Sequence, residues 1–115
     1  MPIPPDIQIL INRLNQELDE TEQEATEGLN LLEKVISRFP ENVILVQYFA
    51  YLNALLLFGE TSRRQIQNTI EIISIADVPV DVIQNYGQDL GTLLGKVIEE
   101  KMRVSRILNF LEELP

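Results

Sequence analysis

Apolar side chains recur at steps of three and four along almost the whole chain, and this spacing constrains the fold more than any other feature. The first such row is unbroken by proline. With one threonine among its members, it occupies positions 7, 10, 14, 18, 21, 25, 29, 32, 36 and 39. Such steps place side chains on one face of an α-helix, so the row predicts one amphipathic helix over residues 6–39. A break at Asp19–Glu20 is the alternative, because Thr21-x-x-Glu24 has the spacing of a capping box.

Prolines and a glycine divide the rest of the chain. Pro40 ends the first helix, because the residue before a proline disfavours the α conformation. Pro40-Glu41-Asn42 opens a predicted second helix that runs to about residue 58, and Gly59 is the residue that ends it. Ser62-x-x-Gln65 has capping-box spacing and predicts a third helix that runs to residue 76. The Asp77-Val78-Pro79 segment separates it from a second long helix over residues 80–113.

This order of elements predicts the architecture. No pair of strand patterns is present, so the fold class is all-α. We expect an elongated helical bundle of four helices, in the order long, short, short, long, completed by dimerisation. The helices form a single domain over residues 6–115, after an extended N-terminal segment over residues 1–5.

The composition excludes several kinds of chemistry. The chain has 115 residues and contains no histidine, cysteine or tryptophan, so a Ser-His-Asp triad, a thiol nucleophile and a zinc finger are excluded. Eighteen acidic residues against nine basic ones give a net charge of −9, which argues against a nucleic-acid footprint. We therefore expect a protein that is not an enzyme, has no cofactor and has no direct nucleic-acid partner.

The ends and the apolar stretches bear on location. The N-terminal Met1-Pro2-Ile3-Pro4-Pro5 lacks the basic and apolar regions of a signal peptide. The most apolar stretch, residues 43–58, has 16 residues, fewer than the roughly 20 that span a bilayer. We expect a cytoplasmic protein without a membrane partner, in which this stretch is a core helix.

The second helix predicts an interface. Its apolar residues cover every face, and a helix that is hydrophobic all round must be buried all round. The other helices of one chain leave part of it uncovered, so we expect an exposed patch that a second copy of the chain covers in a homodimer. The predicted interface residues in this helix are Tyr48, Phe49, Tyr51, Leu52, Leu55 and Leu56. Two polar residues inside it, Gln47 and Asn53, are expected to be buried groups that set the register.

Gly87, Gly91 and Gly95 recur every four residues in the last helix. Glycine costs about 1 kcal/mol relative to alanine in a helix, so close packing is expected to offset three of them. One interpretation is packing inside the chain against Ala50 and Ala54 of the second helix. The alternatives are a close crossing in a dimer interface and a groove for a flat ligand.

Acidic residues are concentrated in the first helix, where Glu17, Glu20, Glu24 and Glu27 form a predicted partner-binding patch. The alternatives are a solvated face and a Mg²⁺ site. Glu17-x-x-Glu20 matches half of the paired carboxylates with which helical Mg²⁺-dependent hydrolases hold metal. The second half is missing, because none of the later glutamates is followed by an acid three residues on.

Basic residues are few. Arg63 and Arg64 are expected at the start of the third helix, where a carboxylate of the same chain would compensate their unfavourable position. The cations of the last helix, Lys101 among them, alternate with glutamates and are expected on a solvent-facing surface.

These patterns predict a small acidic, non-enzymatic helical protein–protein interaction and assembly module, a homodimer. The alternative is an acidic inhibitor or antagonist of an unidentified basic protein, in the manner of a DNA mimic. A Mg²⁺-dependent carboxylate hydrolase is the third candidate.

Overall fold

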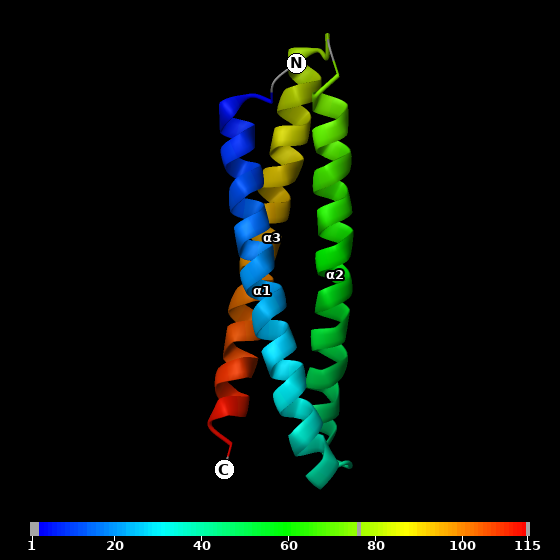
Figure 1. Cartoon of the computed structure of the whole chain (residues 1–115), viewed down its shortest axis with the longest axis vertical. Helices are drawn as coiled ribbons and strands as arrows, with labels where there is room; N and C mark the ends of the chain where they lie inside the picture. Colours follow the sequence, from blue (N-terminus) through cyan, green and yellow to red (C-terminus); the bar gives the residue numbers. More distant parts are fainter. Residues whose placement is uncertain (1–2, 76, 115) are drawn as a thin grey trace.

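Three long helices build the protein, and all of them extend over most of its length. The computed structural model describes residues 3–75 and 77–114. The helices are α1 (Pro5–Arg38), α2 (Val43–Ile73) and α3 (Val80–Glu112). They form an elongated three-helix bundle of 59 × 18 × 16 Å. As Figure 1 shows, α1 and α3 run in one direction and α2 runs in the other. The all-α class is confirmed.

The helix ends follow the predicted signals at two of the junctions. The first helix is continuous, as expected, and ends before Pro40. Asn42 caps α2 with its side chain, whose Oδ1 accepts a hydrogen bond from the backbone N–H of Leu45 at 3.2 Å. Asp77, in the connection between α2 and α3, has a positive φ of 66°, which aspartate tolerates better than most residues. The extended segment expected for residues 1–5 includes residues 1 and 2, which lie outside the described residues, and Pro5 is already helical.

The prediction of four helices is wrong, because the expected second and third helices are one continuous helix. Gly59 is buried inside α2, where a Cβ atom would lie 3.1 Å from Oε1 of Glu22. The glycine therefore serves the close approach of α1 to α2 and does not end a helix. The hydroxyl of Ser62, predicted to cap a new helix, donates to the carbonyl of Phe58 one turn earlier, at 2.8 Å. Thr21 does the same to Glu17 in α1, at 2.7 Å.

The interior consists of two apolar cores with a polar layer between them. The upper core lies at the end of the bundle that holds the α2–α3 connection, and it buries Ile7, Ile11, Leu14, Leu18, Ile66, Ile73, Leu90, Leu93, Leu94 and Val97. The lower core buries Ala25, Leu32, Leu45, Leu52, Leu55, Val104, Ile107 and Leu111. Small or polar buried residues lie between the two cores: Thr21, Gly59 and Ser62. This layer, which we call the polar waist, also contains most of the ion pairs between helices.

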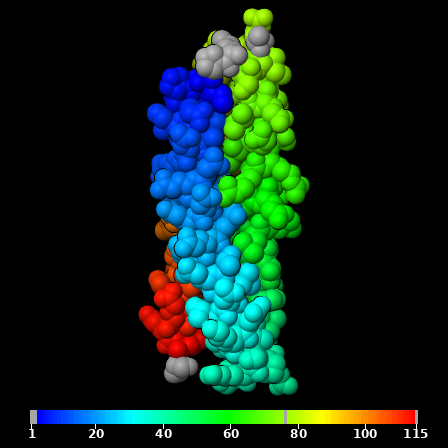
Figure 2. Space-filling model, viewed as in Figure 1, coloured from blue at the N-terminus to red at the C-terminus, as the bar shows by residue number. Residues whose placement is uncertain are grey.

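The other two helices of the chain do not bury α2 on all sides, and the exposed patch expected from the sequence is present. α1 packs along both other helices, whereas α2 and α3 share far fewer contacts. Figure 2 shows α1 and α2 side by side over the length of the molecule, with the C-terminal part of α3 emerging beside α1 at the lower end. Three helices complete the bundle without a second chain, and they leave one side of α2 in solvent.

Candidate interaction surface

The exposed side of α2 carries a mainly apolar stripe in the N-terminal half of the helix, which follows the connection from α1. Its members are Val43, Val46, Ala50, Asn53 and Leu57, which we call the outer face of α2. Val43 is 66% exposed, Val46 46% and Leu57 60%, and the other two are also exposed. The steps between them are three, four, three and four, the spacing of a coiled-coil seam. No charged residue lies between Glu41 and Glu60.

Exposed apolar residues of the other helices adjoin the outer face. Phe49 of α2 lies with Ile36 of α1 at a shallow apolar depression on one side. On the other side, a pocket of about 340 Å³ is lined by Val35, Arg38, Phe39, Asn42, Ile44, Leu45, Phe110 and Leu114. Of the eleven exposed large hydrophobic residues among those the structure describes, seven lie in this half of the bundle: Phe39, Val43, Ile44, Val46, Phe49, Leu57 and Phe110. Concentration of this kind is typical of an interface.

The interface residues predicted in the second helix occupy several environments. Leu52 and Leu55 are buried in the lower core, and Leu56 packs against it. Tyr51 is half-buried, and its hydroxyl donates a hydrogen bond to the carboxylate of Glu100.

Two aromatic residues of the predicted set lie nearer the surface. Tyr48 packs edge-on against Phe110, with 5.8 Å between ring centroids. Phe49 is exposed.

The residues of the outer face were not singled out from the sequence, although a signal was present. The helix is apolar all round, and the predicted interface was centred on its large aromatic side chains. The 3–4–3–4 row from Val43 to Leu57 consists of smaller side chains and was therefore missed. Asn53 was expected to be buried. It is exposed, and its amide donates to the carbonyl of Phe49 at 3.0 Å. A search for a second row with the coiled-coil period would have found this face.

By length and composition alone, α2 is also long and apolar enough to cross a membrane. Its most apolar window of 18 residues has a mean hydropathy of 1.5, and 22% of that window is buried. The 16-residue stretch in the sequence was too short for this, but its fusion with the following segment lengthens the helix. In the structure, α2 packs along α1, and the guanidinium of Arg63 in α2 donates a hydrogen bond to Glu22 of α1.

The predicted acidic patch lies on the side of α1 that faces α3. The ammonium group of Lys101 bridges Glu17, at 3.0 Å, and Glu20. Glu24 accepts a hydrogen bond from the hydroxyl of Ser105 at 2.6 Å. Glu27 is exposed, with the amide of Gln23 at 3.5 Å. Three of the four carboxylates are therefore engaged by α3.

Arg63 forms a second bridge across the polar waist. Its guanidinium donates to Glu22 Oε1 at 2.9 Å through Nε and to Asp19 Oδ1 at 2.7 Å through Nη2. The expected intramolecular carboxylate partner of this arginine is confirmed, although Arg63 lies inside α2 and not at a helix start.

Lys101 was expected on a solvent-facing surface, and its bridge to α1 shows that this expectation was wrong. The sequence offered no signal for it, because the pairing depends on the parallel register of α1 and α3.

The bridge shifts the protonation of both partners. Hydrogen bonds from Lys101, and then from Gln16, lower the pKa of Glu20. Hydrogen bonds to Glu20 and Glu17 raise the pKa of Lys101 above its usual 10.5. Burial, and then the hydrogen bond to Glu100, raise the pKa of Tyr51. Each shift favours the protonation state present at neutral pH.

These shifts predict how stability depends on pH. Because the pKa of Glu20 is lowered on folding, its contribution is present above the unfolded value of about 4.5 and is lost as the pH falls through the folded value. Because the pKa of Lys101 is raised, its contribution is present below about 10.5 and is lost as the pH rises through the folded value. We expect the melting temperature to be highest between these limits and to fall on both sides.

A Lys101→Met variant provides the control for this pH dependence. Its deficit in melting temperature relative to the wild type should be largest near neutral pH and should shrink as the pH falls through the lowered pKa of Glu20, where the bridge to Lys101 loses its charge. A deficit that is equal at all pH values would assign the effect to packing of the side chain and not to charge.

The three glycines of α3 do not meet the alanines of α2. Gly91 and Gly95 are exposed, and a Cβ atom built on either one would meet nothing within 4 Å beyond its own stretch of helix. Gly87 is half-buried, and a Cβ atom built on it would lie 3.6 Å from Cδ1 of Ile7 in α1. Ala50 and Ala54 are also exposed, so the expected packing of the two rows inside the chain is wrong. As an interface with another molecule, the glycine row stays a prediction.

A matched pair of glycine substitutions separates an open position from a packed one. Gly91→Ala should raise the free energy of unfolding by about 1 kcal/mol, because it gains helix propensity in open space. Gly28→Ala should lower it by about 1–2 kcal/mol, because its Cβ would lie 2.8 Å from Cδ1 of the buried Leu52. Urea denaturation measures both. A Gly91→Ala protein that is destabilised would show that the glycine row is covered in solution.

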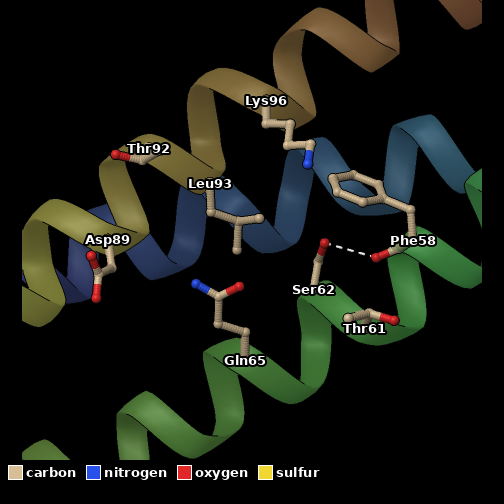
Figure 3. Close-up of a pocket in the computed structure, with 8 residues that line it drawn as sticks. All are labelled: Phe58, Thr61, Ser62, Gln65, Asp89, Thr92, Leu93 and Lys96. Carbon is tan, nitrogen blue, oxygen red and sulfur yellow. Dashed lines mark hydrogen bonds between the residues drawn. The ribbon is translucent and has the colours of Figure 1, made fainter.

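A pocket of about 360 Å³ lies where α2 and α3 diverge (Figure 3). Phe58, Ser62 and Gln65 line it from α2, and the ammonium of Lys96 lies 5.6 Å from the centre of the Phe58 ring. The Ser62 hydroxyl is buried and donates to a backbone carbonyl, as the dashed line in Figure 3 shows, so it is not positioned as a nucleophile.

Within residues 3–75 and 77–114, no group of three or more acidic side chains is placed to hold a metal ion. Comparison with protein-family models, with curated proteins and with solved structures finds no match to this chain.

Proposed function

We propose that this protein is a small acidic, non-enzymatic helical assembly module that self-associates through the outer face of α2. The observation that carries the proposal is the exposed, uncharged stripe with coiled-coil spacing at one end of the bundle. Coiled-coil spacing favours insertion of side chains between those of another helix with the same spacing. A second copy of the chain supplies such a helix, and a two-fold arrangement uses the same surface on both copies.

Charge favours a second copy over other occupants of this face. The chain has a net charge of −9, and a surface of anionic lipid would repel it. A basic protein would find no carboxylate on the uncharged stripe. Two acidic copies also repel each other, but the stripe is the part of α2 where they can approach without placing like charges in contact.

No observation favours the acidic antagonist to the same degree. Three of the four carboxylates proposed to bind a basic partner already accept hydrogen bonds from Lys101 or Ser105. A partner would have to displace these groups before it could pair with the patch, which lowers the net gain from each contact.

Thermal unfolding at several protein concentrations tests the proposal. Association stabilises the folded state by mass action, so the melting temperature should rise as the concentration is raised from about 5 µM to about 1 mM. A melting temperature that is independent of concentration would contradict self-association. Co-sedimentation with vesicles of uncharged phosphatidylcholine, under the same conditions, would assign the outer face to a membrane instead.

A further inference from the structure

We infer that the two copies cross in antiparallel orientation, with the two-fold axis beside Ala50 and Asn53 and with Arg64 of each copy near Glu41 of the other. This inference rests on the self-association proposed above, and it adds the orientation and register of the pair. The order of side-chain sizes along the outer face and the charges at its two ends support this arrangement.

The side-chain sizes favour this register. Small residues, Ala50 and Asn53, occupy the middle of the outer face, with larger valine and leucine side chains on both sides. An antiparallel pair centred between positions 51 and 52 places Ala50 opposite Asn53 of the second copy. It also places Val46 opposite Leu57. Two helices can then approach closely at the centre, while larger side chains fill the layers on either side.

The charges of the stripe beyond Leu57 disfavour the parallel alternative. The same 3–4 row continues through Glu60, Arg64, Gln67 and Glu71. In a parallel pair, each of the three charged residues would face its own copy across the axis, and like charges in contact are unfavourable. In the antiparallel register, Glu60 faces Val43, and Glu71 lies beyond the end of the facing helix.

The antiparallel register also brings opposite charges together. Position 64 lies opposite position 39 of the second copy, in the turn between α1 and α2, and the exposed Glu41 of that turn lies two positions further along, opposite position 62. Arg64 is itself exposed, and its carboxylate neighbour in the same chain, Glu60, is at 3.9 Å. Within one chain, α2 separates Arg64 from Glu41 by about 30 Å at 1.5 Å per residue, so they can meet only between copies.

The length of the contact sets its strength. Residues 43–57 extend over about 21 Å of helix, and one helix is about 10 Å wide. A contact of this size is smaller than the roughly 800 Å² per partner of a standard interface, so the flanking Phe49 and Ile36 must contribute. We expect a dissociation constant in the micromolar range.

Pulsed electron paramagnetic resonance on single-cysteine, spin-labelled variants tests the orientation, because the chain has no cysteine of its own. Gln67→Cys and Gln47→Cys place one label far from the proposed axis and one near it, both at exposed positions of α2. For the antiparallel pair, helix geometry gives about 45 Å between the labels at position 67 and about 15–20 Å at position 47.

The outcomes separate the two proposals. A long distance at position 67 with a short one at position 47 supports the antiparallel register. Short distances at both positions would show a parallel pair, which overturns the register and leaves self-association standing. The absence of any dipolar signal at concentrations up to about 1 mM would overturn both.

A charge exchange tests the Arg64–Glu41 pair without a label. Arg64→Glu should raise the dissociation constant about tenfold, because it places two carboxylates near each other. Adding Glu41→Arg to the same chain should restore most of the affinity. Failure of the second substitution to restore affinity, with unchanged circular dichroism and melting of the protomer, would contradict the register.

Discussion

Leu52→Ala is expected to lower the free energy of unfolding by about 3 kcal/mol, the typical loss for a buried leucine that leaves a cavity. Leu52 is fully buried in the lower core. Its Cδ1 occupies the position beside Gly28 that a Cβ atom would need, because α1 and α2 approach closely there. For a chain of 115 residues, this loss corresponds to a fall of about 12 °C in melting temperature. Urea and thermal denaturation measure it.

Ile9→Ala is the matched control for this truncation. Ile9 is 69% exposed on α1 and lies outside the outer face of α2, so its loss should change the free energy of unfolding by less than about 0.5 kcal/mol. Equal effects of the two substitutions would contradict the placement of Leu52 in the core and the orientation of α2 that follows from it.

A Val46→Glu, Leu57→Glu double variant is expected to abolish self-association and to leave the protomer folded. Both side chains are exposed in the protomer, so the added carboxylates stay in water and the helix keeps its packing. In the pair they would be buried without a partner, which costs several kcal/mol. The dissociation constant should rise at least about 1,000-fold, and the mass in solution should fall to 13.2 kDa.

The control for this variant carries the same added charge elsewhere. Ile9→Glu, Met102→Glu also replaces two exposed apolar residues with glutamate, 69% and 55% exposed, so its net charge matches. It should associate as the wild type does. Loss of association in both double variants would show that overall repulsion, and not the outer face, governs the effect.

The sequence predicts the long helices well, because their ends carry strong local signals. Pro40 and the Asp77-Val78-Pro79 segment interrupt the helical backbone whatever the surroundings. The junction at Gly59 and Ser62 is different. A glycine can end a helix or admit a neighbouring chain, and a serine can cap a helix or bond to the preceding turn. The approach of Glu22 decides the first choice in this protein, and that contact is 37 positions away in the sequence.

The candidate site was predictable in kind but not in detail. The excess of apolar residues in the second helix predicted an exposed patch, and the structure has one. The residues that form this patch depend on which side of α2 packs against the bundle. Buried residues such as Leu52 and Ile66 mark that side. The ion pairs of the polar waist were hidden for the same reason, since Lys101 meets Glu17 only once α1 and α3 are aligned.

The absolute mass of the wild-type protein in solution tests the central claim most directly. Light scattering on a size-exclusion column, with loading concentrations from about 5 µM to about 1 mM, covers the range of micromolar association. The account predicts a mass that rises with concentration toward twice the 13.2 kDa of the chain. A mass that stays at 13.2 kDa throughout would contradict it, and the outer face of α2 would then have no second copy to cover it.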